Sequence, residues 1–188
     1  MYLPKLKGFR LYLIGISYYL IFFTLADLFT IKSVHSHHYI PPYLIRSVSI
    51  EGNTIGDIKC TDQPEIAIKI IAAGRRLGVT LVRGKPLLAG KDATYKAHYG
   101  RLGTVMLSDR FMSPVVRCKL ISHEFIHVLQ HLNADLKGVE PLGWELPLDS
   151  FTRFKSLQEA EAYTYQNRAS DILKLLMGVL QKYENKRL

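Results

Sequence analysis

Cysteine is scarce in this chain of 188 residues, which contains only Cys60 and Cys118. Two cysteines cannot build a four-cysteine zinc site, and their spacing excludes a CxxC pair, so any metal site must rely mainly on nitrogen and oxygen ligands. Seven histidines and sixteen carboxylate side chains are enough to supply them. A disulfide between the two cysteines is one alternative and two buried thiols are the other, because the outcome depends on the compartment.

Acidic residues are also in the minority, since 16 aspartates and glutamates face 25 lysines and arginines and the formal net charge is +9. A basic chain can bind nucleic acid, but here the basic residues are scattered in small groups and form no stripe. The sequence carries no RNA-recognition, zinc-finger or helix-turn-helix signature. Nucleic acid is therefore not the expected partner, and an acidic membrane surface agrees better with the charge.

A long hydrophobic run occurs only near the N-terminus. Residues 11–31 carry Asp27 as their only charge, and their length is close to the roughly 20 residues that span a bilayer core. Residues 24–26 resemble a signal-peptidase site, so a cleaved leader competes with the anchor that we expect, and a helix packed on the domain or at the membrane interface is a third alternative. Three basic residues precede the run and favour a non-cytoplasmic location for the rest of the chain: Lys5, Lys7 and Arg10.

The overall composition, 48% hydrophobic and 22% charged, is typical of a packed globular domain, and no internal repeat is visible. We divide the chain into a hydrophobic segment at residues 1–32, a linker at residues 33–47 with several histidines and prolines, and one domain at residues 48–188. The domain is expected to be α+β, with a small sheet, a buried central helix and C-terminal helices.

Hydrophobic periodicity predicts the elements of this domain. Apolar residues at helical spacing predict a helix over residues 63–77, which a glycine ends. Short β-branched runs predict strands at residues 79–82 and 103–107, separated by a polar stretch with several glycines. The C-terminal part, residues 156–183, is either one long helix or a pair of helices broken near residues 167–170.

One predicted helix carries the motif with chemical meaning. Ser113 and Pro114 are typical of a helix start, because serine caps free amides and proline at the first position loses no hydrogen bond. The run that follows, residues 115–132, contains His-Glu-Phe-Ile-His, which is the HExxH pattern of zinc metallopeptidases. This helix is apolar on nearly all sides, so it should be buried.

The spacing within the motif explains its chemistry. His123 and His127 lie four residues apart, so their imidazoles share one face of the helix and can converge on one metal ion. Glu124 is turned by about 100° from the first histidine and can accept a proton from water at an open coordination position. Two histidines and a glutamate left unpaired in an apolar helix are costly, and a metal removes that cost. The pattern therefore predicts a Zn²⁺ site with Glu124 as general base.

A third ligand is expected from a carboxylate on a later helix, where Glu159 and Glu161 are both available. Ser156 and Glu159 also match a capping box, in which the glutamate would only satisfy a backbone amide. Glu145, in the loop before this helix, is a weaker candidate. His131 is not expected to be a ligand, because it stands about 12 Å along the helix axis from the first motif histidine.

The part of the chain from residues 79–166, under half of its length, resembles the minimal gluzincin-type metallopeptidases. Residues 123–130, His-Glu-Phe-Ile-His-Val-Leu-Gln, are similar to small, little-characterised HExxH proteins of bacteria, including cyanobacteria. Residues 158–163 resemble the ExxA pattern of the gluzincin ligand helix. This match selects Glu159 as the third zinc ligand and leaves Glu161 in reserve.

The resemblance implies a zincin-like domain in which a peptide lies along an edge strand beside the metal, and residues 103–107 are then the expected edge strand. Many gluzincins carry an acidic residue four positions after the ligand glutamate. This sequence has Tyr163 there, so support for a ligand histidine must come from elsewhere. We expect Tyr163 to be a packing residue, and the alternative is that it donates to the oxyanion.

The predicted function is zinc-dependent hydrolysis of peptide bonds in a peptide or protein substrate, by a domain that the N-terminal segment anchors to a membrane or exports. The alternative is a non-catalytic, zinc-stabilised, membrane-associated binding module. That alternative requires a closed coordination sphere, because structural zinc sites are usually closed and catalytic ones keep a position open.

Overall fold

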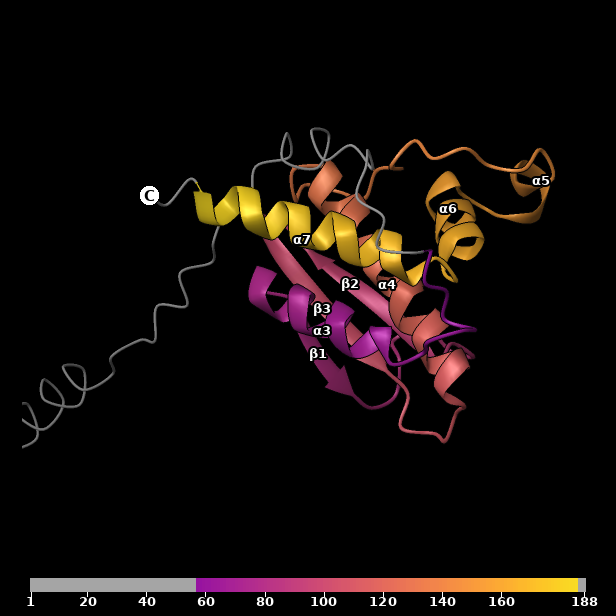
Figure 1. The fold of residues 1–188 in the computed structure, drawn as a ribbon. Coiled ribbons are helices and arrows are strands. Elements are labelled where there is room, and N and C mark those ends of the chain that lie inside the picture. Colours follow the sequence, from indigo (N-terminus) through magenta and orange to yellow (C-terminus); the bar gives the residue numbers. More distant parts are fainter. Residues whose placement is uncertain (1–56, 186–188) are drawn as a thin grey trace, which may run out of the picture. The chain divides into compact units, whose positions relative to one another are not determined.

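The computed structural model describes residues 57–185. This part of the chain has an α+β fold, as predicted, and its elements can be followed in Figure 1. In chain order they are α3 (Ile66–Leu77), β1 (Thr80–Arg83), β2 (Ala93–His98), β3 (Arg101–Leu107), α4 (Pro114–Asn133), α5 (Ser150–Arg153), α6 (Leu157–Tyr165) and α7 (Ala169–Asn185). The hydrophobic segment and the linker predicted at residues 1–47 lie outside the described residues. Within residues 57–185, no helix combines the length and apolar character needed to cross a membrane.

The three strands form a mixed sheet in the order β1-β3-β2, with β1 parallel and β2 antiparallel to β3. The prediction that residues 103–107 form an edge strand is wrong, because β3 is the central strand. The two edge strands are β1 and β2, and β2 lies in a segment that the sequence left as a polar stretch. Its sequence is Ala-Thr-Tyr-Lys-Ala-His, so the strand lacks the β-branched apolar run that normally identifies one.

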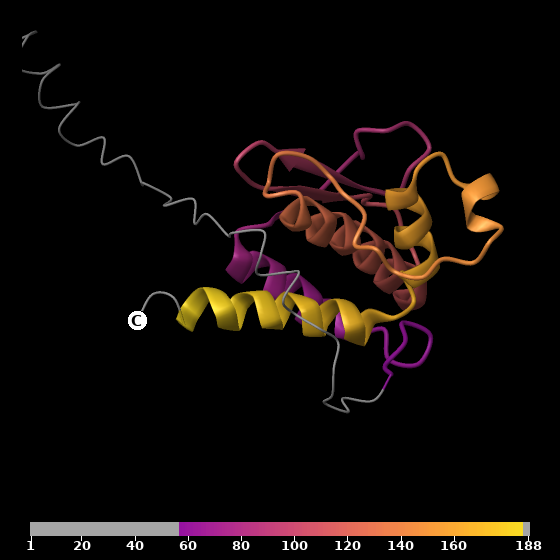
Figure 2. The same ribbon diagram turned by 90° about the horizontal axis from the view of Figure 1, so that it is seen from above.

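The central helix α4 lies between the sheet and α7 (Figure 2), and it contacts β2, β3, α3 and α6 as well. Its start is as predicted, because the Ser113 side chain accepts a hydrogen bond from the backbone N–H of Val116 and Pro114 occupies the first turn. The close packing of α3 on α4 depends on Gly74, where a Cβ atom would lie 2.0 Å from the Phe125 ring. The motif helix is therefore buried by neighbours on several sides.

Two alternatives left open by the sequence are resolved by the structure. Cys60 and Cys118 form a disulfide, which ties the segment before α3 to the first half of α4. The C-terminal part is a pair of helices, α6 and α7, and the break between them falls at residues 166–168. The first helix of the pair, α6, packs against α4.

Candidate metal centre

The two motif histidines face the same cavity from successive turns of α4. Their Nε2 atoms lie 3.2 Å apart, and both side chains are largely buried. Burial and, to a smaller extent, the nearby His127 lower the pKa of His123 to about 4, while Glu159 opposes the shift. At neutral pH His123 is therefore uncharged, which is the state in which an imidazole binds a metal.

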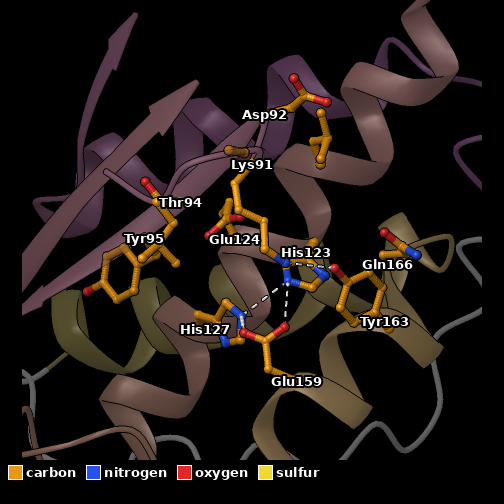
Figure 3. Close-up of a pocket in the computed structure, with 13 residues that line it drawn as sticks. Lys91, Asp92, Thr94, Tyr95, His123, Glu124, His127, Glu159, Tyr163 and Gln166 are labelled. Carbon is orange, nitrogen blue, oxygen red and sulfur yellow. Dashed lines mark hydrogen bonds and ion pairs between the residues drawn. The ribbon is translucent and has the colours of Figure 1, made fainter. Parts of the chain in front are cut away.

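Glu159 reaches this pair from the first turn of α6. Its two carboxylate oxygens lie 3.7 Å from Nε2 of His123 and 3.4 Å from Nε2 of His127, and Figure 3 shows the three side chains pointing toward one another. Ser156 caps the helix by accepting a hydrogen bond from the backbone N–H of Glu159. The cap and the carboxylate thus act separately, because capping engages the amide of Glu159 while its side chain faces the histidines.

The three side chains fit a tetrahedral metal ion. Ligand atoms of His123, His127 and Glu159 all lie within 4.8 Å of one another. Two nitrogen ligands of one tetrahedral zinc ion, each at about 2.05 Å, are separated by about 3.3 Å. The observed separations of 3.2, 3.4 and 3.7 Å agree with this geometry. Among residues 57–185, no other group of histidine, cysteine, aspartate and glutamate side chains comes close enough together to hold a metal ion.

Gln130, one turn after His127, holds the ring of that histidine. Its Oε1 lies 2.8 Å from His127 Nδ1, while its Nε2 donates to the backbone oxygen of Gln158 and to Glu161. Because the amide nitrogen already faces two acceptors, the amide oxygen must accept from Nδ1–H of the histidine. In the neutral imidazole of His127 the lone pair is therefore on Nε2, the atom that faces Glu159. Gln130 thus supports His127, which an acidic residue at position 163 cannot do because this chain has Tyr163 there.

Glu161, the reserve ligand, lies elsewhere. Its side chain is 1% exposed and its oxygens accept hydrogen bonds from the backbone N–H groups of Leu142, Gly143 and Trp144 at 2.7 to 3.1 Å. The carboxylate thus holds the loop before α5 against α4 and α6. Glu145 belongs to the same loop, and it lines a separate cavity that the metal cluster does not share.

Glu124 lies on the same cavity as the metal ligands, on the side toward β2 (Figure 3). It is 4% exposed, and burial raises its pKa to about 7, although the charge of His127 and a backbone hydrogen bond from Tyr95 pull the pKa down. A carboxylate with such a pKa accepts a proton more readily than an ordinary glutamate, so its position and its basicity suit a general base.

The cavity has a volume of about 120 Å³ and lies between β2, α4 and α6. Beside Glu124, Lys91 donates a hydrogen bond to the hydroxyl of Tyr163 at 3.1 Å, and the Tyr163 ring packs edge-on against His123. Tyr163 is thus a packing partner of a ligand histidine, as expected. Lys91 was not predicted, because nothing in the sequence signals that the loop before β2 reaches across to α6.

His131 lies apart from the metal cluster, as expected. The hydroxyl of Tyr95 lies 2.8 Å from His131 Nδ1 and also accepts the backbone N–H of Gly103. Burial raises the pKa of Tyr95, so the phenol stays protonated and donates to the ring nitrogen. His131 therefore ties α4 to the edge of the sheet.

Comparison of the chain with protein-family models, with curated proteins and with solved structures finds no match. The interpretation of the site therefore depends on its geometry and on the motif.

Proposed function

We propose that this protein is a zinc-dependent peptidase with a zincin-like domain, in which His123, His127 and Glu159 hold the metal. The observation that carries the proposal is the convergence of these three donors beside a buried glutamate, Glu124, on one cavity. A cluster made only to stabilise the fold has no need of a further carboxylate with a raised pKa at its edge.

Zinc bound by these residues supplies Lewis acidity, which polarises a peptide carbonyl and makes water acidic enough to lose a proton near neutral pH. Glu124 then accepts the proton of the attacking water and passes it to the departing amine. Its burial keeps bulk water away, and the backbone hydrogen bond from Tyr95 fixes its direction. Gln130 keeps His127 in the tautomer that leaves Nε2 free.

The position of β2 supports a peptide as the substrate. Among the described residues β2 pairs only with β3, so its outer edge, next to the cavity, offers backbone groups to an added strand. Residues 92–95 line the cavity at the start of this strand. An extended peptide placed along β2 therefore runs past Glu124 and the metal ligands. The strand β2 thus takes the role of the peptide-binding edge strand, which we had expected residues 103–107 to have.

The donor count distinguishes this proposal from a zinc-stabilised binding module. Within residues 57–185 the cluster consists of two imidazoles and one carboxylate, and Glu161 is engaged by backbone amides. Three protein ligands with an adjacent cavity are typical of catalytic zinc, whereas structural zinc usually has four. The geometry therefore favours catalysis over the binding module.

We also propose that the domain works outside the cytoplasm, in an anchored or exported form. The disulfide between Cys60 and Cys118 supports this location, because such bonds persist mainly in oxidising compartments. The hydrophobic run at residues 11–31 is consistent with either route.

The decisive test combines metal analysis with hydrolysis of a quenched-fluorescent peptide library by the full-length protein. We expect about one zinc per chain, and hydrolysis that a chelator abolishes and zinc restores. Glu124→Gln should keep the zinc and lose at least about 100-fold in rate, whereas Glu140→Gln, an exposed carboxylate, should change neither. Zinc binding without hydrolysis of any library member would instead support the binding module.

A further inference from the structure

A second and larger cavity lies against the first half of α4 and shares no lining residue with the metal cavity. It is a groove of about 820 Å³ bordered by α3, β1, the end of β3 and the start of α4, elements that Figure 1 shows side by side. The volume is within the roughly 300 to 1,000 Å³ of small-molecule sites, and it exceeds the 120 Å³ of the metal cavity. The proposed peptidase activity leaves this groove without a role.

The floor of the groove is apolar. Ile71 from α3, Leu81 from β1 and Met112 from the segment before α4 are half-buried there, above the fully buried Ile121 and the Cys118 sulfur. Ile68 adds an apolar side chain that is 69% exposed at one border. A ligand with an apolar body therefore removes from water a surface that the described residues leave partly wet.

The border of the groove is basic. Arg75, Arg83 and Arg117 line it from α3, β1 and α4, and Glu65 is the single acidic residue among the lining side chains. Within residues 57–185 none of the three arginines forms an ion pair or a side-chain hydrogen bond, in contrast to Arg76, which pairs with Glu184. Their guanidinium groups are therefore available to an anion, and their planar geometry suits a carboxylate.

The composition of the lining limits the chemistry of the ligand. Every lining residue is either apolar or charged, so among the described side chains none brings a hydroxyl, an amide or an imidazole into the groove. A peptide or a sugar carries hydrogen-bonding groups along its whole length and finds few side-chain partners here. A molecule with one anionic end and a long apolar body matches both the floor and the border.

We infer that this groove binds a free long-chain fatty acid, with its carboxylate at the basic border formed by Arg75, Arg83 and Arg117 and its hydrocarbon chain on the floor formed by Ile71, Leu81 and Met112. We propose a ligand with a single hydrocarbon chain because the volume of the groove, about 820 Å³, is that of a site for one small molecule. The inference does not depend on the peptidase activity, since the groove shares none of its lining residues with the metal cavity.

The test uses the full-length protein reconstituted in phosphatidylcholine vesicles with a photoreactive palmitic acid. After irradiation, mass spectrometry should locate the label on Ile68, Ile71, Leu81 or Met112. Excess palmitic acid should abolish this labelling, whereas hexadecanol, which has the same chain without the charge, should compete at least about tenfold less well. Equal competition by the alcohol would overturn the assignment of the arginines.

Two kinds of variant examine the groove itself. The triple variant R75Q/R83Q/R117Q should lower the labelling at least about tenfold, and a triple variant of exposed basic residues elsewhere, R101Q/R153Q/K155Q, should leave it unchanged. Ala72→Phe, which adds a ring at an exposed position of α3 that lines the groove, should also block labelling without removing charge. Labelling that persists in both groove variants would overturn the inference.

A parallel sample with a photoreactive phosphatidylserine separates the free acid from a membrane lipid. Labelling of the groove by the phospholipid with none by palmitic acid would overturn the choice of a single-chain ligand. Zinc content and peptide hydrolysis are measured on the same variants, and we expect them to be unchanged, so failure of this inference can be told apart from failure of the peptidase proposal.

Discussion

The amide oxygen of Gln130 accepts a hydrogen bond from Nδ1 of His127 at 2.8 Å, and this contact determines which nitrogen of His127 faces Glu159. The same amide donates to Glu161, which in turn accepts the backbone N–H groups of the loop at residues 142–144. A continuous set of hydrogen bonds therefore links the candidate metal ligand to the loop that covers the start of α6.

Replacing Gln130 by alanine should weaken zinc binding about 10- to 100-fold, because the ring of His127 loses the acceptor that fixes its tautomer and orientation. Competition with a chromogenic chelator measures the affinity. Asn133→Ala is the matched control, since Asn133 donates to Pro141 in the same loop without contacting a ligand histidine. Equal zinc affinity in the wild type and in Gln130→Ala would show that His127 needs no such support.

The two glutamates of α6 should respond differently to the same substitution. Glu159→Gln removes a charged ligand and should abolish stoichiometric zinc binding, with little effect on the stability of the metal-free protein, because its side chain is 40% exposed. Glu161→Gln should keep the zinc but lower the free energy of unfolding by about 1 to 3 kcal/mol, since backbone amides lose a charged acceptor. Elemental analysis and urea unfolding give the two readings. The opposite pattern would make Glu161 the ligand.

The burial of Glu124 predicts a pH-dependent cost in the metal-free protein. Its pKa is about 7 in the fold against 4.5 unfolded, so the folded state holds the proton more tightly and stability falls as pH rises from 4.5 to 7. Glu124→Gln has no such charge. We expect the variant to match the wild type near pH 4.5 and to be more stable by up to about 3 kcal/mol above pH 7.

Urea unfolding of both proteins after chelation, between pH 4.5 and 8, checks this prediction. The difference between the two proteins is the useful quantity, because His123 and His127 titrate in both and their contributions largely cancel. A difference that stays constant across the pH range would mean that Glu124 is not buried as a charge, and its suitability as a general base would be weakened.

How far the sequence predicts this structure depends on the range of the interactions. The motif helix follows from local signals, namely the Ser113 cap, the proline and the apolar run, and α4 begins and ends within a residue of the expected bounds. The position of Glu159 beside the histidines agrees with a short sequence pattern on α6. In both cases the relevant information lies within one helix.

The features that the sequence did not predict depend on contacts between distant segments. The edge strand β2 has no apolar run of its own, and it is held by pairing with β3 and by the Tyr95 hydroxyl, which accepts the N–H of Gly103. Gln130 looks like any polar residue on a helix until Glu161 and the loop at residues 142–144 are placed around it. Neither role has a signature at fixed spacing, so a single sequence cannot reveal it.

The disulfide gives a last prediction about stability. Cys60 and Cys118 are 58 residues apart, and a crosslink that closes a loop of this length stabilises the fold by about 4 kcal/mol in the chain-entropy account. The double variant C60A/C118A should therefore unfold at a clearly lower urea concentration than the oxidised wild type. A reducing agent should shift the wild type toward the variant and leave the variant itself unchanged.

Zinc content should persist in the folded variant, because both cysteines lie outside the metal cluster. Coincident unfolding curves for the oxidised wild type and the variant would mean that the bond adds nothing to stability.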